Sequence, residues 1–201
     1  GHEGAACREA DVMVSIRPFD ASDGSADVFE LMRIDAQCEG DEHYVFYGPH
    51  WWKDFAREPR GHAFVAELAG DLAGFVAARC SAEGAYLAWL FVEKAHRRRG
   101  VARALLSHVL SLAAGRSRGG LMTLHVETSN EPAISLYQAA GFWLRQTGAG
   151  SPVVVEDHPC HGCHSHVMEA RLCPSNAPGD ALGPEAAGGA SKRPRADPST
   201  E

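Results

Sequence analysis

The chain has 201 residues, of which 45% are hydrophobic and 22% charged, and its formal net charge is -7. These values fit one folded domain with a tail and exclude wholesale disorder. The negative net charge argues against a nucleic-acid partner, because a protein that binds nucleic acid needs a basic surface. The sequence contains no run of about 18 apolar residues and no signal-peptide pattern. We therefore expect a cytoplasmic protein without a membrane partner.

Apolar residues alternate or run continuously where strands are expected, and recur every three or four positions where helices are expected. In chain order, these segments are a strand at 13–17, helices at 25–37 and 51–57, strands at 63–68, 72–79 and 85–92, a helix at 100–114, a strand at 121–127, a helix at 130–140, and strands at 142–146 and 166–172. Residues 69–71 have the composition of a hairpin turn. Ser25 and Asn130 are suitable N-caps, and Gly141 is suited to end the helix before it. The pattern predicts an α/β fold with a mixed sheet.

The two ends of the chain differ in composition from the segment between them. Residues 173–201 are rich in Pro, Gly, Ala and Ser and can bury too little apolar surface to become ordered. We therefore expect a domain over 13–172, a disordered tail after it and a disordered segment at 1–12. The basic group at 192–195 leaves nuclear import open, although such groups in a solvated tail usually have no such role.

A basic turn joins the apolar strand at 85–92 to the helix that starts near Gly100. Between Lys94 and Arg118 there are seven Lys or Arg residues and no Asp or Glu. Gly100 and Ala102 are small, so a ligand can approach the backbone there closely. The free N–H groups at the helix start and the helix dipole favour an anion at this place. The segment predicts a pyrophosphate site, although a solvated basic helix end would show the same pattern.

Two motifs, taken together, resemble those of a known family. The first is RRRGVA at 97–102, which matches (Q/R)-x-x-G-x-(G/A). The second matches N-x-x-A-x-x-x-Y-x-x-x-G-F, and its residues are Asn130, Ala133, Tyr137, Gly141 and Phe142. On these motifs the chain is identified as a member of the GNAT acetyltransferases. It is most similar to the protein N-terminal acetyltransferases of the NatA and NatE types.

The resemblance implies the GNAT fold, with a mostly antiparallel sheet, about four flanking helices, and fourth and fifth strands that splay around acetyl-CoA. It also implies that acetyl-CoA is the cosubstrate and that no metal is required. The residues implied to bind acetyl-CoA are Leu90, Phe91, Val92, Arg97, Arg98, Arg99, Gly100, Val101, Ala102, Arg103, Asn130, Ala133 and Tyr137.

Three side chains acquire chemical roles from the same resemblance. Tyr137 stands where the family's acid protonates the departing thiolate. Tyr86 and His125 stand where the NatE type keeps a pair of residues that removes the amine proton through water. These roles imply direct attack of the amine within a ternary complex. Without the resemblance, a Tyr or His on an apolar strand would more often be a core residue.

The acceptor implied is a protein N-terminal α-amino group, and an auxiliary subunit is compatible with that role. The chain departs from the N-terminal acetyltransferases at 148–155, where GAGSPVVV replaces their usual Tyr-Tyr pair. A small amine (a polyamine, amino sugar or amino acid) and a non-catalytic CoA-binding module therefore stay open as alternatives.

Two further stretches are conspicuous in composition. Residues 20–42 include eight acidic side chains, which we interpret as a solvated helix face rather than an acidic rim of the acceptor site. The Cys- and His-rich stretch at 158–166 is interpreted as a loop rather than a metal site, because structural zinc usually takes two separated pairs of ligands.

Overall fold

The computed structural model describes residues 13–38, 48–156 and 164–173. Its eight-stranded sheet has the order β1-β2-β3-β4-β5-β8-β6, with β7 paired to β8, and only the β4–β5 ladder of this sheet is parallel. The elements are β1 (Val14–Pro18), α1 (Ala26–Cys38), α2 (Gly48–Arg57), β2 (Gly61–Leu68), β3 (Asp71–Cys80), β4 (Gly84–Val92), the 3-10 turn η1 (Lys94–His96), α3 (Val101–Arg116), β5 (Leu121–Glu127), α4 (Glu131–Ala139), β6 (Trp143–Leu144), β7 (Val154–Val155) and β8 (Ser165–Arg171). The predicted mixed, mostly antiparallel sheet with four helices is confirmed.

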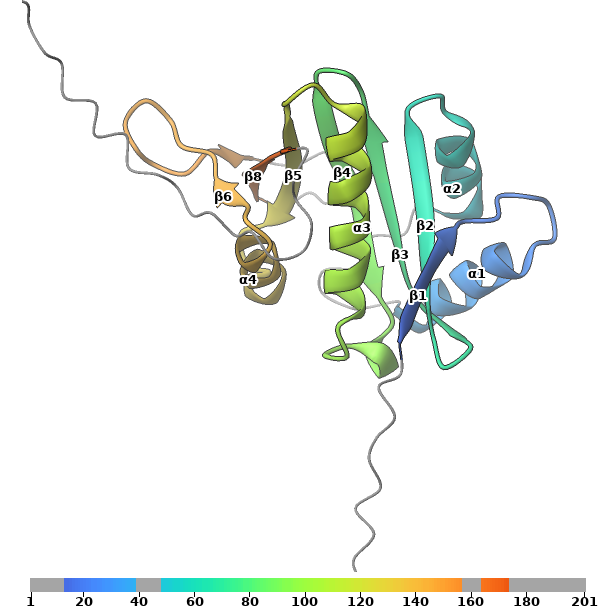
Figure 1. Cartoon of the computed structure of the whole chain (residues 1–201). Coiled ribbons are helices and arrows are strands. Elements are labelled where there is room, and N and C mark those ends of the chain that lie inside the picture. The colour runs from blue at the N-terminus through green and yellow to red at the C-terminus, as the bar shows by residue number, and fades with distance from the viewer. Residues whose placement is uncertain (1–12, 39–47, 157–163, 174–201) are drawn as a thin grey trace, which may run out of the picture.

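Helices cover both faces of the sheet, so the molecule has two apolar cores (Figure 1). On one face, α3 inserts Leu105 and Val109, both with no exposed surface, against β3 and β4. On the other face, α2 buries Trp52 and Phe55 beneath β2 and β3. The tryptophan pair of α2 therefore packs the core, and Trp51 stacks on Phe55 at 4.9 Å between ring centroids.

The predicted helix caps and hairpin are present. Ser25 Oγ accepts a hydrogen bond from the Val28 N–H at 3.2 Å, and Asn130 Oδ1 accepts one from the Ala133 N–H at 3.1 Å. Between β2 and β3, Ala69 and the glycine after it adopt φ angles of 58° and 89°. Two successive positive φ angles are typical of a type I′ turn, whose twist matches that of the paired strands.

The last part of the sheet differs from the prediction. The strand expected at 142–146 is only two residues long, and the short β7 was not predicted. Two-residue strands carry too little alternation to be recognised from sequence. The expected disordered segment at 1–12, the expected disordered tail at 173–201 apart from its first residue, and most of the Cys- and His-rich stretch lie outside the described residues.

Within the part of the chain that the structure describes, no helix is long and apolar enough to cross a membrane.

Candidate active site

The fourth and fifth strands separate soon after they meet. Their ladder covers only Gly84–Tyr86 of β4 against Leu121–Thr123 of β5. Strand β4 then continues to Val92 with β3 on its other edge. An extended ligand with amide groups can add to such an open strand edge through backbone hydrogen bonds. The stretch Leu90–Val92, expected to bind acetyl-CoA, lies on this part of β4.

A β-bulge at Ala88 changes which side chains of β4 face each core. Leu87 and Trp89 lie opposite consecutive residues of β3, so Ala88 is the additional residue between them. As a result, Leu87 and Leu90 both pack on the α3 side, although they are three positions apart. Bulges redirect strand side chains in this way and end regular pairing. The bulge leaves no signal in the sequence, because the residues on both sides of it are all apolar.

The start of α3 presents unpaired backbone donors. Gly100 is the N-cap with φ 85°, and no side chain caps the helix there. The Ala104 N–H donates to the Gly100 carbonyl at 3.0 Å, so the N–H groups of Val101–Arg103 precede the helical ladder. A Cβ atom built on Gly100 would meet no atom within 4 Å, which leaves open space in front of these donors. The arrangement fits the predicted pyrophosphate site.

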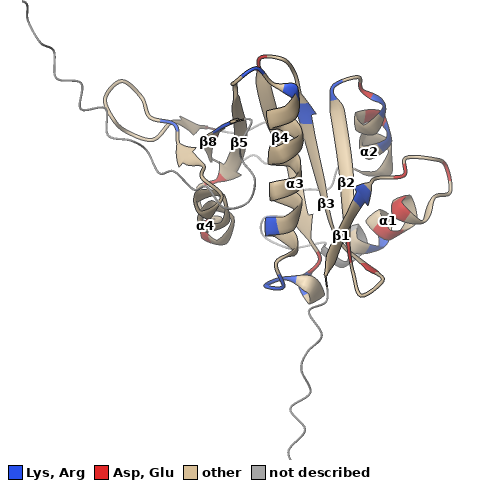
Figure 2. Cartoon of the chain, in the orientation of Figure 1, with Lys and Arg blue, Asp and Glu red and all other residues tan. Residues whose placement is uncertain are grey.

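Figure 2 shows Lys and Arg positions along the turn at the lower end of α3, and four arginine side chains there are exposed. They are Arg97, Arg98, Arg99 and Arg103. Arg97 folds back, and its Nε donates to the Val92 carbonyl at 3.0 Å. The side chains of Phe91 and Val101 are buried in the two cores, so only their backbone atoms are available to a ligand. Ala102, in the first turn of α3, is half-buried.

Tyr86 on β4 and His125 on β5 are brought together. Both are half-buried, and their rings lie edge to face with centroids 5.9 Å apart and planes at 83°. The neighbouring Leu87 and Leu124 pack into the α3 core. Since side chains alternate along a strand, Tyr86 and His125 lie on the opposite face, away from α3.

Tyr137 on α4 lies on the α3 side of the sheet, with 8% of its surface exposed. Its ring packs against Phe142 at 5.7 Å. Burial raises the pKa of the Tyr137 phenol well above its ordinary value, and the neighbouring Tyr86 adds to the rise. The phenol therefore keeps its proton at neutral pH, as a proton donor must.

The other two residues of the second motif that are implied to bind acetyl-CoA, Asn130 and Ala133, hold the helix that carries Tyr137. The side chain of Asn130 is engaged in capping α4, and Ala133 is half-buried against the α3 core. Their observed contacts are structural.

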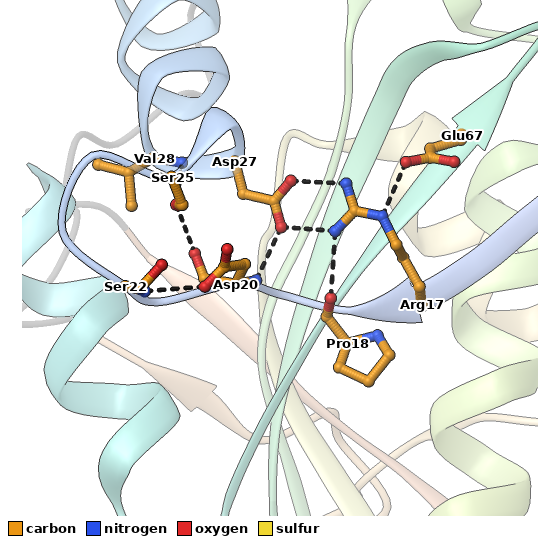
Figure 3. A network of polar contacts seen from close by, with 8 residues as sticks. All are labelled: Arg17, Pro18, Asp20, Ser22, Ser25, Asp27, Val28 and Glu67. Atoms are coloured by element: carbon orange, nitrogen blue, oxygen red, sulfur yellow. Dashed lines mark hydrogen bonds and ion pairs between the residues drawn. The ribbon is translucent and has the colours of Figure 1, made fainter.

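The acidic stretch at 20–42 contains a buried carboxylate, Asp27, that was not predicted from the sequence (Figure 3). Asp27 is 2% exposed, so the interpretation of this stretch as a solvated face is wrong at that residue. The Nη1 and Nη2 groups of Arg17 each donate to the Asp27 carboxylate at 2.6 Å, and Arg17 Nε donates to Glu67 at 2.7 Å. The Asp20 N–H donates to Asp27 at 2.7 Å. The cluster joins β1, α1 and β2.

Across residues 13–38, 48–156 and 164–173, no three His, Cys, Asp or Glu side chains gather in a way that could hold a metal ion.

Comparisons with known proteins agree with this geometry. A model described as the acetyltransferase (GNAT) family matches residues 26–142. N-alpha-acetyltransferase RimI of Mycobacterium tuberculosis is 34% identical over 122 residues, which cover 56% of this chain and 75% of that protein. Peptidyl-lysine N-acetyltransferase YiaC of Escherichia coli is 34% identical over 107 residues, covering 50% of this chain and 67% of that protein. The solved structure of Ard1 from Thermoplasma volcanium aligns with a TM-score of 0.64 at 24% identity, covering 79% of this chain and 97% of that one.

Proposed function

The chain belongs to the GNAT family of acetyl-CoA-dependent acetyltransferases, and we propose that its acceptor is the α-amino group of a protein N-terminus. The observation that carries the proposal is the pairing of Tyr86 with His125 across β4 and β5. The name of the RimI relative, an N-alpha-acetyltransferase, supports the same acceptor class.

The residues of this site divide the reaction between the two faces of the sheet. The nitrogen of the amine attacks the carbonyl carbon of the thioester, so that a C–N bond forms and the C–S bond breaks. On the face away from α3, Tyr86 and His125 receive the amine proton through water and pass it to solvent. On the α3 face, the protonated phenol of Tyr137 gives a proton to the departing thiolate.

Binding of acetyl-CoA is assigned to backbone groups more than to side chains. The N–H groups of Val101–Arg103 would hold the pyrophosphate, and the open edge of β4 at Leu90–Val92 would pair with the pantetheine amides. The exposed arginines beside Gly100 add positive potential to a molecule that is acidic overall.

The type of base favours an α-amino acceptor over a strongly basic amine. An α-amino group has an ordinary pKa of about 8, whereas a lysine or polyamine lies near 10.4 and is harder to deprotonate. Strand β4 carries Tyr86 and no Asp or Glu that could serve as a carboxylate base in its place. A small-molecule amine is the second candidate, because the Tyr-Tyr pair of N-terminal acetyltransferases is replaced at 148–155. The cytoplasmic location stays a prediction.

The deciding experiment is a turnover screen. The protein with acetyl-CoA is offered a library of peptides that differ at their first residues and a panel of polyamines, amino sugars and amino acids, and free CoA is measured with a thiol reagent. We expect turnover of peptides with a free N-terminus and none of the same peptides with a blocked N-terminus. Faster turnover of any small amine would replace the proposed acceptor with that amine. Binding of acetyl-CoA without turnover of any amine would indicate a non-catalytic module.

A further inference from the structure

Strand register places four polar side chains in one row across the middle of the sheet. Arg79 lies opposite Tyr86, Tyr86 opposite Thr123, and Thr123 opposite Glu169, on the adjacent strands β3, β4, β5 and β8. Directly opposed residues share a face, and neighbouring strands lie about 4.8 Å apart. The row therefore lies on the same face as His125 and one pleat away from it.

A cleft of about 590 Å³ is lined by three residues of this row, Arg79, Tyr86 and Thr123. Tyr86 and Thr123 contribute hydroxyl groups to its lining, and three arginines stand around them at Arg60, Arg79 and Arg145. Glu83 is the single carboxylate among the cleft's lining residues. The chain as a whole carries a net charge of -7, so a cleft with more cations than anions is a local departure from its average.

Two of these guanidinium groups are held in fixed positions. Arg79 donates from Nε and Nη2 to Glu58 at 2.7 and 3.0 Å, and its guanidinium lies 4.5 Å from the centroid of the Phe55 ring. Arg145 binds the buried Glu169 through Nε and Nη2. Glu58 and Glu169 do not line the cleft.

Neither of these ion pairs uses Nη1, so the Nη1 group of each arginine can donate to a further acceptor. A planar guanidinium held in this way is suited to bind a carboxylate.

The reaction centre and this cleft share Tyr86, which limits where an acceptor can extend. An extended peptide advances about 3.5 Å per residue. If its amine lies beside Tyr86 and His125, its second and third residues fall within reach of the arginines. A polyamine carries no carboxylate that could accept hydrogen bonds from the Nη1 groups.

We propose that this cleft selects acceptor peptides that carry Asp or Glu at the second or third position. The inference rests on the proposed N-terminal acetyltransferase function and specifies its substrate class.

Arg60 is exposed at the turn between α2 and β2, and it takes no part in the ion pairs with Glu58 and Glu169. It therefore offers the variant with the least risk to folding.

The test compares kcat/KM for three peptides that share the first residue and carry Glu-Glu, Gln-Gln or Lys-Lys at positions two and three. We expect the acidic peptide to exceed the basic one by about tenfold or more, and the difference to shrink as salt is added. Arg60→Glu should remove most of the difference while leaving the KM for acetyl-CoA and the rate with the Gln-Gln peptide nearly unchanged. Arg57→Glu is the matched control, because Arg57 is an exposed arginine at the end of α2 that does not line the cleft.

Arg145→Lys provides a second variant, which keeps the charge and removes the planar fork. It should lower the rate with the acidic peptide more than the rate with the neutral one. Equal rates with all three peptides, or a preference that Arg60→Glu and Arg57→Glu change alike, would overturn this inference and leave the N-terminal activity standing. No turnover of any peptide would overturn the proposed function and this inference with it.

Discussion

The ring of Tyr86 meets the ring of His125 edge to face across the β4–β5 junction, where the two strands begin to separate. A relay through water needs two polar groups on one face of the sheet within reach of a shared solvent molecule. Ring centroids 5.9 Å apart on one face of the sheet place the two side chains in edge-to-face contact. The two rings are therefore expected to act as one unit.

The first prediction concerns this shared action. Tyr86→Phe and His125→Ala should each lower kcat, and the double variant should be little worse than the more damaging single variant, because residues of one relay lose the same function. The measurement is kcat at saturating peptide and acetyl-CoA for the four proteins. Losses that multiply would indicate two independent roles, and the small-amine acceptor would then be favoured.

The pH profile of the same variants separates a chemical role of His125 from a structural one. Only neutral imidazole accepts a proton, so protonation of His125 would remove its ability to act as a base. Turnover by the wild-type protein should therefore fall on the acidic side, and His125→Ala should flatten that limb. An unaltered limb in His125→Ala would show that the imidazole only packs against Tyr86.

The second prediction concerns Gly100 at the start of α3. Gly100→Glu places a carboxylate in the open space before the unpaired N–H groups, so acetyl-CoA binding measured by calorimetry should weaken by about a hundredfold or more. Gly70→Glu is a matched control, because Gly70 has a similar φ of 89° and equally open surroundings but lies in the β2–β3 turn. Both variants carry the same backbone strain, and both should keep the native circular dichroism spectrum. Equal affinity for acetyl-CoA in the two variants would show that the pyrophosphate does not bind at this turn.

The third prediction concerns Tyr137. Tyr137→Phe keeps the packing against Phe142 and removes the proton, so kcat should fall by about 10² or more with little change in acetyl-CoA affinity. Because burial holds the phenol pKa above its usual value of about 10, the wild-type protein should lose no turnover through deprotonation of Tyr137 up to pH 10. Near wild-type kcat in Tyr137→Phe would mean that water supplies the proton to the thiolate.

Much of the fold could be predicted because its elements are long and carry their own end signals. The apolar period of α3, the caps at Ser25 and Asn130, and the turn at Ala69 are local features, and each was found where it was expected. The bulge at Ala88 could not be predicted, because β4 is covered on both faces and the residues around the bulge are all apolar. A change in which of them face each side of the sheet therefore does not alter the sequence pattern.

The candidate site, too, could be predicted from the sequence only in part. The motif residues could be located in the sequence, but the row from Arg79 to Glu169 depends on the register of the hairpin β3–β4 with β5 and β8, which lie far from it along the chain. Arg145 stands next to a two-residue strand that carries no recognisable pattern. Charged residues such as Asp27 and Glu169 are usually exposed, and only their arginine partners explain why these two are buried.

The last prediction concerns the stability that Asp27 provides. Asp27→Asn keeps the shape of the side chain but removes the charge from a carboxylate that is 2% exposed and accepts bonds from Arg17 and from the Asp20 N–H. Loss of one partner of a fully buried ion pair costs about 3–5 kcal/mol, and because Arg17 is 42% exposed we expect about 2 kcal/mol. The measurement is the free energy of unfolding in urea, followed by circular dichroism.

Glu30→Gln is the control for this change, because Glu30 pairs with Arg33 on the same helix and both side chains are about two-fifths exposed. A solvated pair of this kind contributes less than about 1 kcal/mol, because water screens the attraction and ordering two long side chains costs entropy. The midpoint of unfolding should therefore fall clearly for Asp27→Asn and hardly for Glu30→Gln, with the slope of the transition unchanged in both. Equal shifts would mean that burial of Asp27 adds nothing to its pairing with Arg17, and that β1 and α1 are held together by their apolar contacts alone.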